Sequence, residues 1–425
     1  MKFGFAKEII TPKSKIALAC FVTSKNPEQP YLTIHDDVFV RTCYIENGSK
    51  LLMIVFDLLF HNDELNNKIM DYSAEKYGIP RATVLVNYTH SHTAPAARGY
   101  CDILASEEYE DFLFERASAC IDRALTNLIE GEVGYESVPC DWSISRRRIT
   151  NGMCGGIEPS DDNVREKRMD ILKFVDLTGK IRGIVTFYAS HPVHFPGEGA
   201  ISGEYPSRLC ALLECEYYGA YALFFQGAGA TSHPRTVVSG TRFVKREYED
   251  VDIFAAALFK VVKTAIDQNK FQPLKLLISG STDQIRLGLE VKPKEYFEAA
   301  SKTDMGIINN YGVKRILENY ETMPDFILVN AGMIRLADRL FICHMGGEPG
   351  YEIKELLMRA LPDIRIIFVG YTDSCSYVPT DQMLAEGGYE VHCYIEYAKP
   401  GILKPGIDAK VIHSFREMYD KLLIE

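Results

Sequence analysis

The sequence lacks the features that mark membrane, secreted and nucleic-acid-binding proteins. No apolar run approaches the roughly 20 residues that a membrane helix needs, because the best candidate, residues 51–60, is interrupted by Asp57. No apolar segment follows Lys2, so we expect no secretion signal. Basic residues are outnumbered, 47 against 58 acidic residues, which gives a net charge of −11. Nucleic acids and anionic membranes bind basic surfaces, so we expect no nucleic-acid partner and no stable membrane association.

Several familiar catalytic and metal-binding signatures are missing as well. The 11 cysteines are scattered, and the neighbouring pair Cys210 and Cys215 does not have zinc-finger spacing. No Gly-x-Ser-x-Gly motif occurs, which removes the commonest signal of a serine hydrolase. Gly-Ala-Gly-Ala at residues 227–230 follows an apolar run, but no Lys-Ser or Lys-Thr completes a phosphate-binding loop. Without a secretion signal the thiols are expected to be reduced, and we expect the protein in the cytoplasm.

What the sequence does have is an alternation of apolar and amphipathic segments along 425 residues, 47% of them hydrophobic. Short runs rich in Val, Ile, Phe and Tyr favour strands, and they lie at residues 51–56, 83–86, 171–175, 184–188, 222–225, 274–278, 340–343 and 364–369. Longer amphipathic stretches favour helices, and they lie at residues 63–77, 107–129, 247–266, 294–320 and 351–360. The alternation predicts an α/β fold with helices packed around a substantial sheet, mixed rather than purely parallel.

Nothing in the sequence divides the chain into separate units. There is no repeat of fixed period, no low-complexity tract and no Pro/Gly/Ser-rich linker. Residues 146–163 are loop-like, and arginines cluster at their start, so we interpret them as an active-site loop rather than a domain boundary. We therefore predict a single catalytic domain over residues 1–425.

Polar side chains follow four of the predicted strands at the point where each strand ends. His90 follows residues 83–86, and His191 follows residues 184–188. Glu348 comes after residues 340–343, and Tyr377 comes after residues 364–369. In open α/β sheets, ligands bind beyond the carboxyl ends of the strands, where loops bring side chains together. The joint placement of two imidazoles, a carboxylate and a phenol predicts a metal site.

Each of these residues also has an ordinary interpretation. His90 and His92 leave the same face of an extended segment, but a His-x-His pair is more often two ordinary polar residues. Glu348 could be a solvated turn residue and Tyr377 a core residue. A His-x-His motif after an early strand also occurs near the start of amidohydrolase barrels. This sequence does not show the eight even strand–helix repeats of such a barrel. Only the combination favours a metal centre.

An ordered set of short motifs resembles the catalytic domain of the neutral/alkaline non-lysosomal ceramidases. The motifs run collinearly from about residue 3 to about residue 395. They are Ile-Thr-Pro at 10–12, His-Asp-Asp at 35–37, Thr-His-Ser-His at 89–92, Ser-His-Pro at 190–192, Ile-Ser-Gly-Glu-Tyr-Pro at 201–206, Phe-Gln-Gly-Ala-Gly at 225–229, Gly-Glu at 347–348 and the tyrosines at 377 and 389.

The resemblance implies a zinc-dependent amidase of mixed α/β architecture. Carried over residue by residue, it implies Zn²⁺ ligation by two histidines, a glutamate and a tyrosine, namely His90, His191, Glu348 and Tyr377. It also implies contacts to the substrate or the transition state from His92, Arg146 and Tyr389, although Arg146 stands first of three consecutive arginines, which allows a register slip of one.

Two departures from the family pattern concern the substrate. Where the ceramidases have a serine near the metal, this sequence has His233, and Thr231 replaces a nearby acid. The chain also lacks the family's additional C-terminal domain and secretion signal, so we expect neither. These departures put ceramide in doubt as the substrate and leave the metal site intact.

The expected chemistry is attack of zinc-activated water on an amide carbonyl, with His92 carrying the proton to the leaving amine. His194 and His233 either line the substrate pocket or are ordinary loop histidines. A small-molecule substrate is expected in each enzymatic alternative. One alternative is a metal-dependent hydrolase or lyase of a small polar metabolite, such as a sugar derivative. The other is a non-catalytic binding protein that kept the fold.

Overall fold

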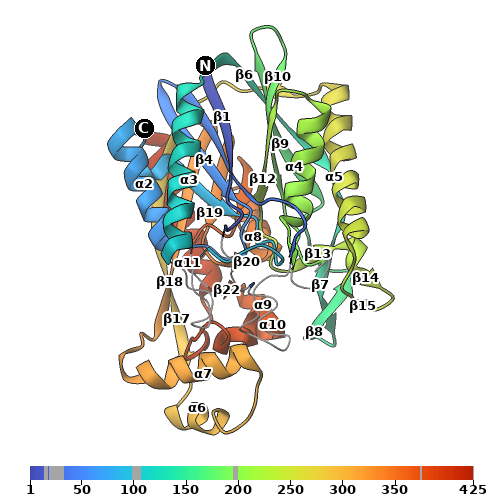
Figure 1. Ribbon diagram of the computed structural model, residues 1–425. Helices are drawn as coiled ribbons and strands as arrows, with labels where there is room; N and C mark the ends of the chain where they lie inside the picture. The colour runs from blue at the N-terminus through green and yellow to red at the C-terminus, as the bar shows by residue number, and fades with distance from the viewer. Residues whose placement is uncertain (14–17, 19–32, 98–106, 195–199, 374–375, 425) are drawn as a thin grey trace.

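The computed structural model describes residues 1–13, 18, 33–97, 107–194, 200–373 and 376–424. Within them, two large β-sheets stack on each other and helices cover the outer face of each sheet (Figure 1). The prediction of a mixed α/β fold is confirmed.

The larger sheet has nine strands and contains both parallel and antiparallel pairs. Its order is β12-β10-β9-β6-β1-β3-β4-β5, with β16 pairing β6 at the side. The pairs β4–β5 and β10–β12 are parallel and the other pairs are antiparallel. The strands are β1 (Lys2–Ile9), β3 (Phe39–Asn47), β4 (Ser49–Phe56), β5 (Val84–Tyr88), β6 (Ile129–Pro139), β9 (Arg168–Asp176), β10 (Ile181–Tyr188), β12 (Tyr221–Gln226) and β16 (Gln272–Pro273).

The second sheet has five strands in the order β21-β19-β18-β17-β23, and only β19–β21 is a parallel pair. These strands are β17 (Ser279–Val291), β18 (Phe326–Ala337), β19 (Leu340–Met345), β21 (Arg365–Val369) and β23 (Gly401–Leu403). Short pairings surround the sheets: β2 (Thr33–Ile34) with β11 (Ala200–Ile201), β7 (Ser143–Thr150) with β8 (Met153–Ser160) and β13 (Ser232–Pro234), β14 (Val238–Ser239) with β15 (Arg242–Phe243), and β20 (Glu348–Pro349) with β22 (Tyr377–Val378).

The helices and the buried side chains define four layers. α2 (Asp63–Tyr77) and α3 (Glu107–Thr126) cover one half of the larger sheet, and α4 (Glu204–Glu216) and α5 (Tyr248–Gln268) cover the other half (Figure 1). α8 (Tyr351–Ala360) and α11 (Ile407–Ile424) cover the smaller sheet. The other described helices are α6 (Lys294–Ala300), α7 (Ile307–Asn319), α9 (Asp381–Glu386) and α10 (Tyr389–His392).

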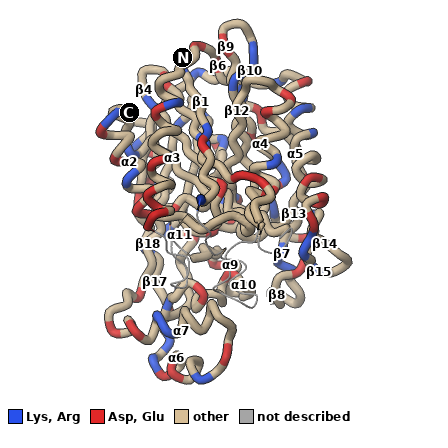
Figure 2. Tube along the Cα trace, in the orientation of Figure 1, with Lys and Arg blue, Asp and Glu red and all other residues tan. Residues whose placement is uncertain are grey.

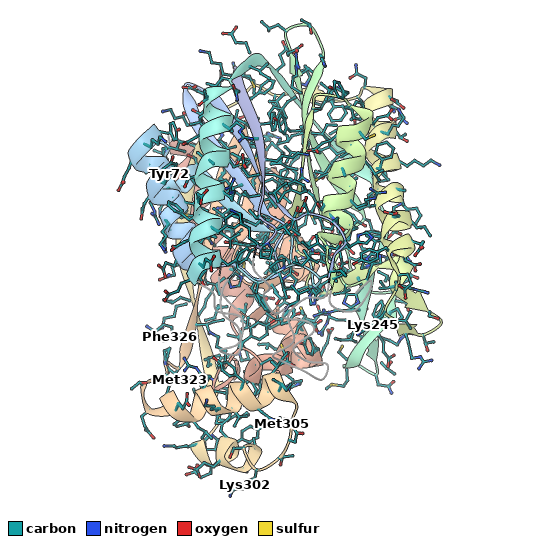
Figure 3. All side chains as sticks on the ribbon, viewed as in Figure 1. Tyr72, Lys245, Lys302, Met305, Met323 and Phe326 are labelled. Carbon is teal, nitrogen blue, oxygen red and sulfur yellow. The ribbon has the colours of Figure 1, made fainter. Side chains whose placement is uncertain are left out.

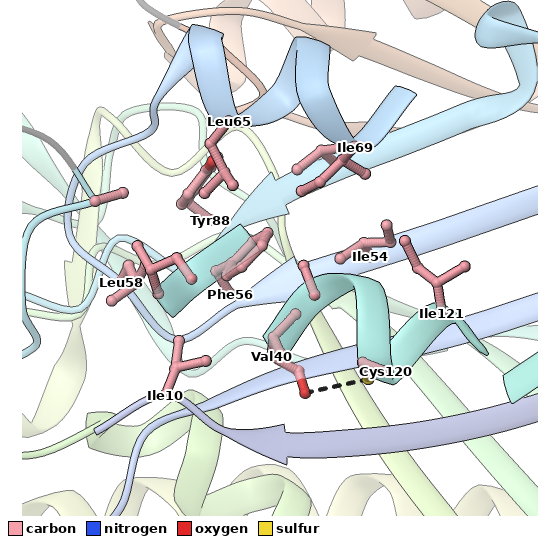
Figure 4. Close-up of a cluster of buried hydrophobic side chains, with 14 of the residues drawn as sticks. Ile10, Val40, Ile54, Phe56, Leu58, Leu65, Ile69, Tyr88, Cys120 and Ile121 are labelled. Atoms are coloured by element: carbon pink, nitrogen blue, oxygen red, sulfur yellow. Dashed lines mark hydrogen bonds between the residues drawn. The ribbon is translucent and has the colours of Figure 1, made fainter. Parts of the chain in front are cut away.

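Strand β4 illustrates how the sequence produces these layers. Its Leu52, Ile54 and Phe56 pack in the cluster under α2 and α3, which Figure 4 shows in part. The alternate residues, Met53 and Val55 among them, pack against the second sheet. Side chains of a strand point alternately to the two faces, so a strand buried on both faces is a continuous apolar run.

Three of the predicted segments differ from the observed structure. Residues 274–278 are not a strand, because the extended pairing begins only at Ser279. Residues 294–320 are not one helix but two, α6 and α7, which project from the far end of β17 and β18 near Met305 and Met323 (Figures 1 and 3). Residues 146–163 are not a loop, since they fall largely within the hairpin of β7 and β8. The helices at 63–77 and 351–360 are confirmed.

Charged side chains of both signs are spread over the outer surface (Figure 2). Acidic residues gather at the lower end of α3, where its first turn holds Glu107, Glu108 and Glu110. Over the part of the chain that the structure describes, none of the helices combines the length and apolarity needed to cross a bilayer.

Candidate metal centre

Three strand ends from the two sheets meet at one place and carry the candidate ligands. His90 lies two residues beyond β5, and His191 lies three residues beyond β10. The side chain of Asn87 in β5 also ties the ends of β12 and β21 to this place, because its Nδ2 donates to Gly370 O at 2.7 Å and its Oδ1 accepts from Gln226 N at 2.9 Å. The Gly347 turn after β19 reaches the same place, where Tyr371 N donates to Gly347 O at 3.0 Å.

His90, His92 and His191 form a cluster that could hold a metal ion. One nitrogen from each ring lies within 4.8 Å of the other two. His191 Nε2 is 3.0 Å from His92 Nε2. Glu348 belongs to the same group, since its Oε2 lies 3.3 Å from His90 Nε2 and 3.9 Å from His191 Nε2. Four of the residues selected from the sequence therefore converge.

The hydrogen bonding of His90 indicates what occupies the space between these atoms. His90 Nδ1 lies 2.7 Å from the carbonyl oxygen of Leu59, so Nδ1 carries the proton and Nε2 presents a lone pair. That lone pair faces the buried Glu348 Oε2, which has no hydrogen-bond partner in the described structure. Two electron-rich atoms at 3.3 Å repel unless a cation lies beside them. A tetrahedral zinc with bonds of 2.0–2.1 Å has edges of about 3.3 Å, so the donor set fits a zinc ion.

Burial and neighbouring charge hold the ring nitrogens in the form that binds metals. Burial, followed by the charge of Arg146, lowers the pKa of both His92 and His191 well below the usual value. Burial alone would raise the pKa of Glu348, but a hydrogen bond from Tyr397 and the charge of Arg146 lower it and favour the ionised carboxylate. Neutral imidazoles beside an ionised carboxylate are the protonation states that metal ligation requires.

The backbone at His90 is in a rare conformation. His90 has a φ of 61° and Tyr371 a φ of 52°, both in the left-handed region. Non-glycine residues in this region are uncommon and cluster at functional sites. The two rings lie 4.6 Å apart between centroids. Tyr371 OH also lies 3.5 Å from His191 Nδ1, on the side of the ring away from the cluster.

Arg146 lies close enough to this cluster for its charge to lower the pKa of His92 and His191. Its guanidinium stacks over the rings of Tyr377 and Tyr389, at 5.2 and 5.5 Å from their centroids. Its Nε donates to Glu390 Oε1 at 2.8 Å. The next residue, Arg147, pairs instead with Glu390 Oε2 and with Glu386. Of these two neighbours, Arg146 is therefore the one that stacks on the candidate tyrosines.

The rings of Tyr377 and Tyr389 pack against each other next to Glu348. Tyr377 is the register partner of Glu348 in the short parallel pair β20–β22. Its ring lies 5.6 Å from that of Tyr389 between centroids. Tyr389 OH donates to Glu396 Oε2 at 2.7 Å. Both phenols have a raised pKa, caused mainly by burial.

The two histidines expected to line the substrate pocket have different surroundings. His233 Nε2 is 3.3 Å from Arg146 Nη1, and its ring is 5.7 Å from that of His191 between centroids. His194 is fully buried, with Nδ1 at 3.2 Å from Glu204 Oε2 and Nε2 at 2.7 Å from Thr236 Oγ1. Both ring nitrogens of His194 are thus engaged by the protein, whereas the buried His233 Nδ1 has no hydrogen-bond partner within the described part of the chain.

Three residues at the centre were not selected from the sequence. Tyr397 OH donates to Glu348 Oε1 at 2.6 Å, Tyr371 packs on His90, and Glu390 holds Arg146. Of these, only Tyr371 had a sequence signal, because it follows a predicted strand directly. Tyr397 and Glu390 lie in short helical turns, where nothing in their spacing distinguishes them from ordinary residues.

No family model matches the chain. A crystal structure of the neutral ceramidase from Pseudomonas aeruginosa has 18% sequence identity to it and a TM-score of 0.73, over 98% of this chain and 73% of that chain. A ceramidase complexed with C2 has 16% identity and a TM-score of 0.75, over 100% of this chain and 75% of that chain. The fold is ceramidase-like. Identities this low establish the fold alone and leave the substrate open.

Proposed function

We propose that this protein is a zinc-dependent hydrolase that cleaves an amide bond. The observation that supports the proposal most directly is the convergence of two histidines on one carboxylate oxygen. Glu348 Oε2 lies 3.3 Å from His90 Nε2 and 3.9 Å from His191 Nε2. The ceramidase-like fold is consistent with it, since both compared structures are ceramidases. In this proposal His90, His191, Glu348 and Tyr377 hold the metal.

A bound zinc ion would lower the pKa of its water to about 7, so that a neighbouring base can remove the proton near neutral pH. The protein's own groups provide the remaining functions. His92, kept neutral by burial, accepts the proton of the attacking water and returns it to the leaving amine. Arg146, held by Glu390, places a fixed positive charge where the carbonyl oxygen becomes negative. Tyr389, stacked on Arg146, would orient the same group.

A second candidate function is that of a hydrolase or lyase that acts on a small polar compound at the same metal centre. The surroundings of His233 favour it, because this buried ring has one nitrogen beside Arg146 and the other has no partner among the residues that the structure describes. A buried polar group without a partner is costly unless a ligand satisfies it. A polar substrate group would do so, and an alkyl chain would not. In this second candidate, His233 binds the substrate and His194 has a positioning role through its contact with Glu204.

The proposal is tested by loading the purified protein with zinc and assaying three substrate sets: N-acyl sphingoid amides, small polar amides and sugar derivatives. We expect zinc-dependent amide cleavage that a chelator abolishes and added zinc restores. Cleavage that persists without metal would refute the metal mechanism. Activity on the sugar derivatives alone would replace the amide proposal with the second candidate. If a His233→Ser variant cleaves sphingoid amides faster than the wild type, position 233 contributes to the choice of substrate.

A further inference from the structure

Tyr371 lies where segments that carry candidate metal ligands meet. It follows the end of β21 by two residues and is 1% exposed. Its amide N–H donates to Gly347 O at 3.0 Å, directly before Glu348 in the chain. Its carbonyl oxygen accepts a hydrogen bond from Tyr88 N at 3.2 Å, two residues before His90. The backbone of this one residue therefore joins the segment of the candidate carboxylate ligand to that of a candidate imidazole ligand.

The conformation of Tyr371 indicates that its side chain is used. Its φ of 52° lies in the left-handed region, which glycine adopts freely and a bulky residue adopts only at a cost. Such a conformation persists where the surroundings determine it, and it is commonest at functional sites. A glycine at this position would make the same two backbone hydrogen bonds without the cost. The tyrosine side chain is therefore the part that needs an explanation.

The side chain of Tyr371 reaches both candidate imidazole ligands. Its ring lies 4.6 Å from that of His90 between centroids, at an interplanar angle of 33°. Its hydroxyl oxygen lies 3.5 Å from His191 Nδ1. Hydrogen bonds at active sites are often long until the complex forms, so we expect this contact to shorten when His191 binds a metal. The ring thus packs on one histidine while the hydroxyl meets the other.

The two histidines need the same kind of support. A histidine that binds a metal through one ring nitrogen usually donates a hydrogen bond from the other, which fixes the tautomer and the orientation of the ring. For His90 the acceptor is Leu59 O, 2.7 Å from Nδ1. His191 also directs Nε2 toward Glu348 Oε2, at 3.9 Å. With Nε2 on a metal, Nδ1 of His191 carries the proton, and the oxygen of Tyr371 is the atom placed to accept it.

Other contacts hold the main chain at His191 and do not orient its ring. His191 N donates to Ser232 O at 2.9 Å. The hydroxyl of Tyr205 donates to Ser190 O. Neither contact involves the imidazole. Within the described residues, the hydrogen bond available to Nδ1 is the one with Tyr371.

We infer that Tyr371 is a positioning residue of the metal centre. Its hydroxyl accepts the Nδ1 proton of His191 and so turns the Nε2 lone pair toward the cation that His191 shares with Glu348. The inference rests on the proposed function, because it takes His191 as a metal ligand. It assigns Tyr371 no contact with the substrate. Zinc affinity, rather than turnover alone, is therefore the quantity that should depend on the hydroxyl.

Tyr371→Phe tests this role, since it removes the hydroxyl and keeps the ring that packs on His90. Competition with a chelator measures the zinc affinity of the full chain. We expect Tyr371→Phe to bind zinc at least tenfold more weakly than the wild type. Tyr109→Phe is the matched control, because Tyr109 is also buried and its hydroxyl donates to Ile10 O at 2.8 Å on α3. Its zinc affinity should stay within twofold of the wild-type value.

The outcomes separate this inference from the proposed function. A loss of less than tenfold in Tyr371→Phe would overturn the role of Tyr371 and leave the zinc site standing, whereas a wild type that binds no zinc would overturn both. Equal losses in the two variants would reveal a general effect of a lost buried hydroxyl, which also overturns the inference. If Tyr371→Phe does not fold, Tyr371→4-fluorophenylalanine takes the same test, because its fluorine fills the place of the hydroxyl and accepts hydrogen bonds poorly.

Discussion

Tyr397 donates a hydrogen bond of 2.6 Å from its hydroxyl to Glu348 Oε1, while the other oxygen of Glu348 faces His90 at 3.3 Å. The phenol therefore fixes the rotation of the carboxylate and directs Oε2 toward the cluster. Groups that hold a metal ligand in this way commonly matter nearly as much as the ligand itself. Tyr397 and Glu348 are 49 residues apart in the chain.

Tyr397→Phe should weaken zinc binding by about 10–100-fold, because Glu348 would lose the bond that orients it. The measurement is zinc affinity by competition with a chelator. Tyr394→Phe is the matched control, since its hydroxyl makes only a 3.5 Å contact to Tyr296 OH, and it should bind zinc like the wild type. Equal affinities in both variants would remove Tyr397 from the metal centre.

His92→Ala should lower turnover by about 10²–10³-fold and leave zinc in place, because His92 is assigned to proton transfer while Glu348 serves as a ligand. The two quantities to compare are kcat and bound zinc per chain. His92 Nε2 lies 3.0 Å from His191 Nε2, close enough for both nitrogens to bind the same ion. Loss of zinc in His92→Ala would make it a ligand and refute the catalytic assignment.

Glu390→Gln should lower the free energy of unfolding by about 3–5 kcal/mol, because it would leave the buried charge of Arg146 uncompensated and Arg147 paired with Glu386 alone. The side chains of Glu390, Arg146 and Arg147 are at most 3% exposed. Urea denaturation measures the change. Glu158→Gln is the control, since its pair with Arg148 is largely exposed and should contribute at most about 1 kcal/mol. Similar losses in both variants would contradict the buried network.

Asp57 should make stability depend on pH. Burial raises its pKa from 3.8 to about 6, against the opposing charge of Arg41. The folded state therefore favours the protonated carboxyl. This contribution is complete below about pH 4 and is lost as the pH rises through about 6.

Between pH 4 and pH 7 the free energy of unfolding of the wild type should therefore fall by about 2 kcal/mol more than that of Asp57→Asn. Urea denaturation at a series of pH values measures both curves. The asparagine can still accept the hydrogen bond that Phe39 N makes to Asp57 Oδ2 at 3.1 Å. Parallel curves for the two proteins would show that Asp57 does not titrate in this range.

The sequence predicted those parts of the structure that follow from local patterns. The apolar run at residues 51–56 identified β4 as a strand, and the amphipathic period of residues 63–77 identified α2 with its observed bounds. His90, His191 and Glu348 could be selected because each follows a strand, and strand ends are where side chains from distant segments meet.

The remaining features depend on tertiary contacts that have no local pattern. Residues 146–163, which begin with three arginines, were interpreted as a loop. β7 is nevertheless a strand, because it pairs with β8 and β13, and Glu390 from far along the chain neutralises Arg146 and Arg147. Residues 294–320 are amphipathic throughout, but the chain turns at Gly306, where φ is 84°. Tyr397 could not be selected, because only the fold brings its hydroxyl to Glu348.

The central claim is that His90, His191 and Glu348 bind one cation together. The most direct measurement is the zinc content of the full chain after reconstitution and dialysis, for the wild type and for the double variant His90→Ala/Glu348→Gln. The account predicts about one zinc per wild-type chain and less than about a tenth of that in the variant. A wild type that retains no zinc, or a variant that retains as much as the wild type, would contradict it.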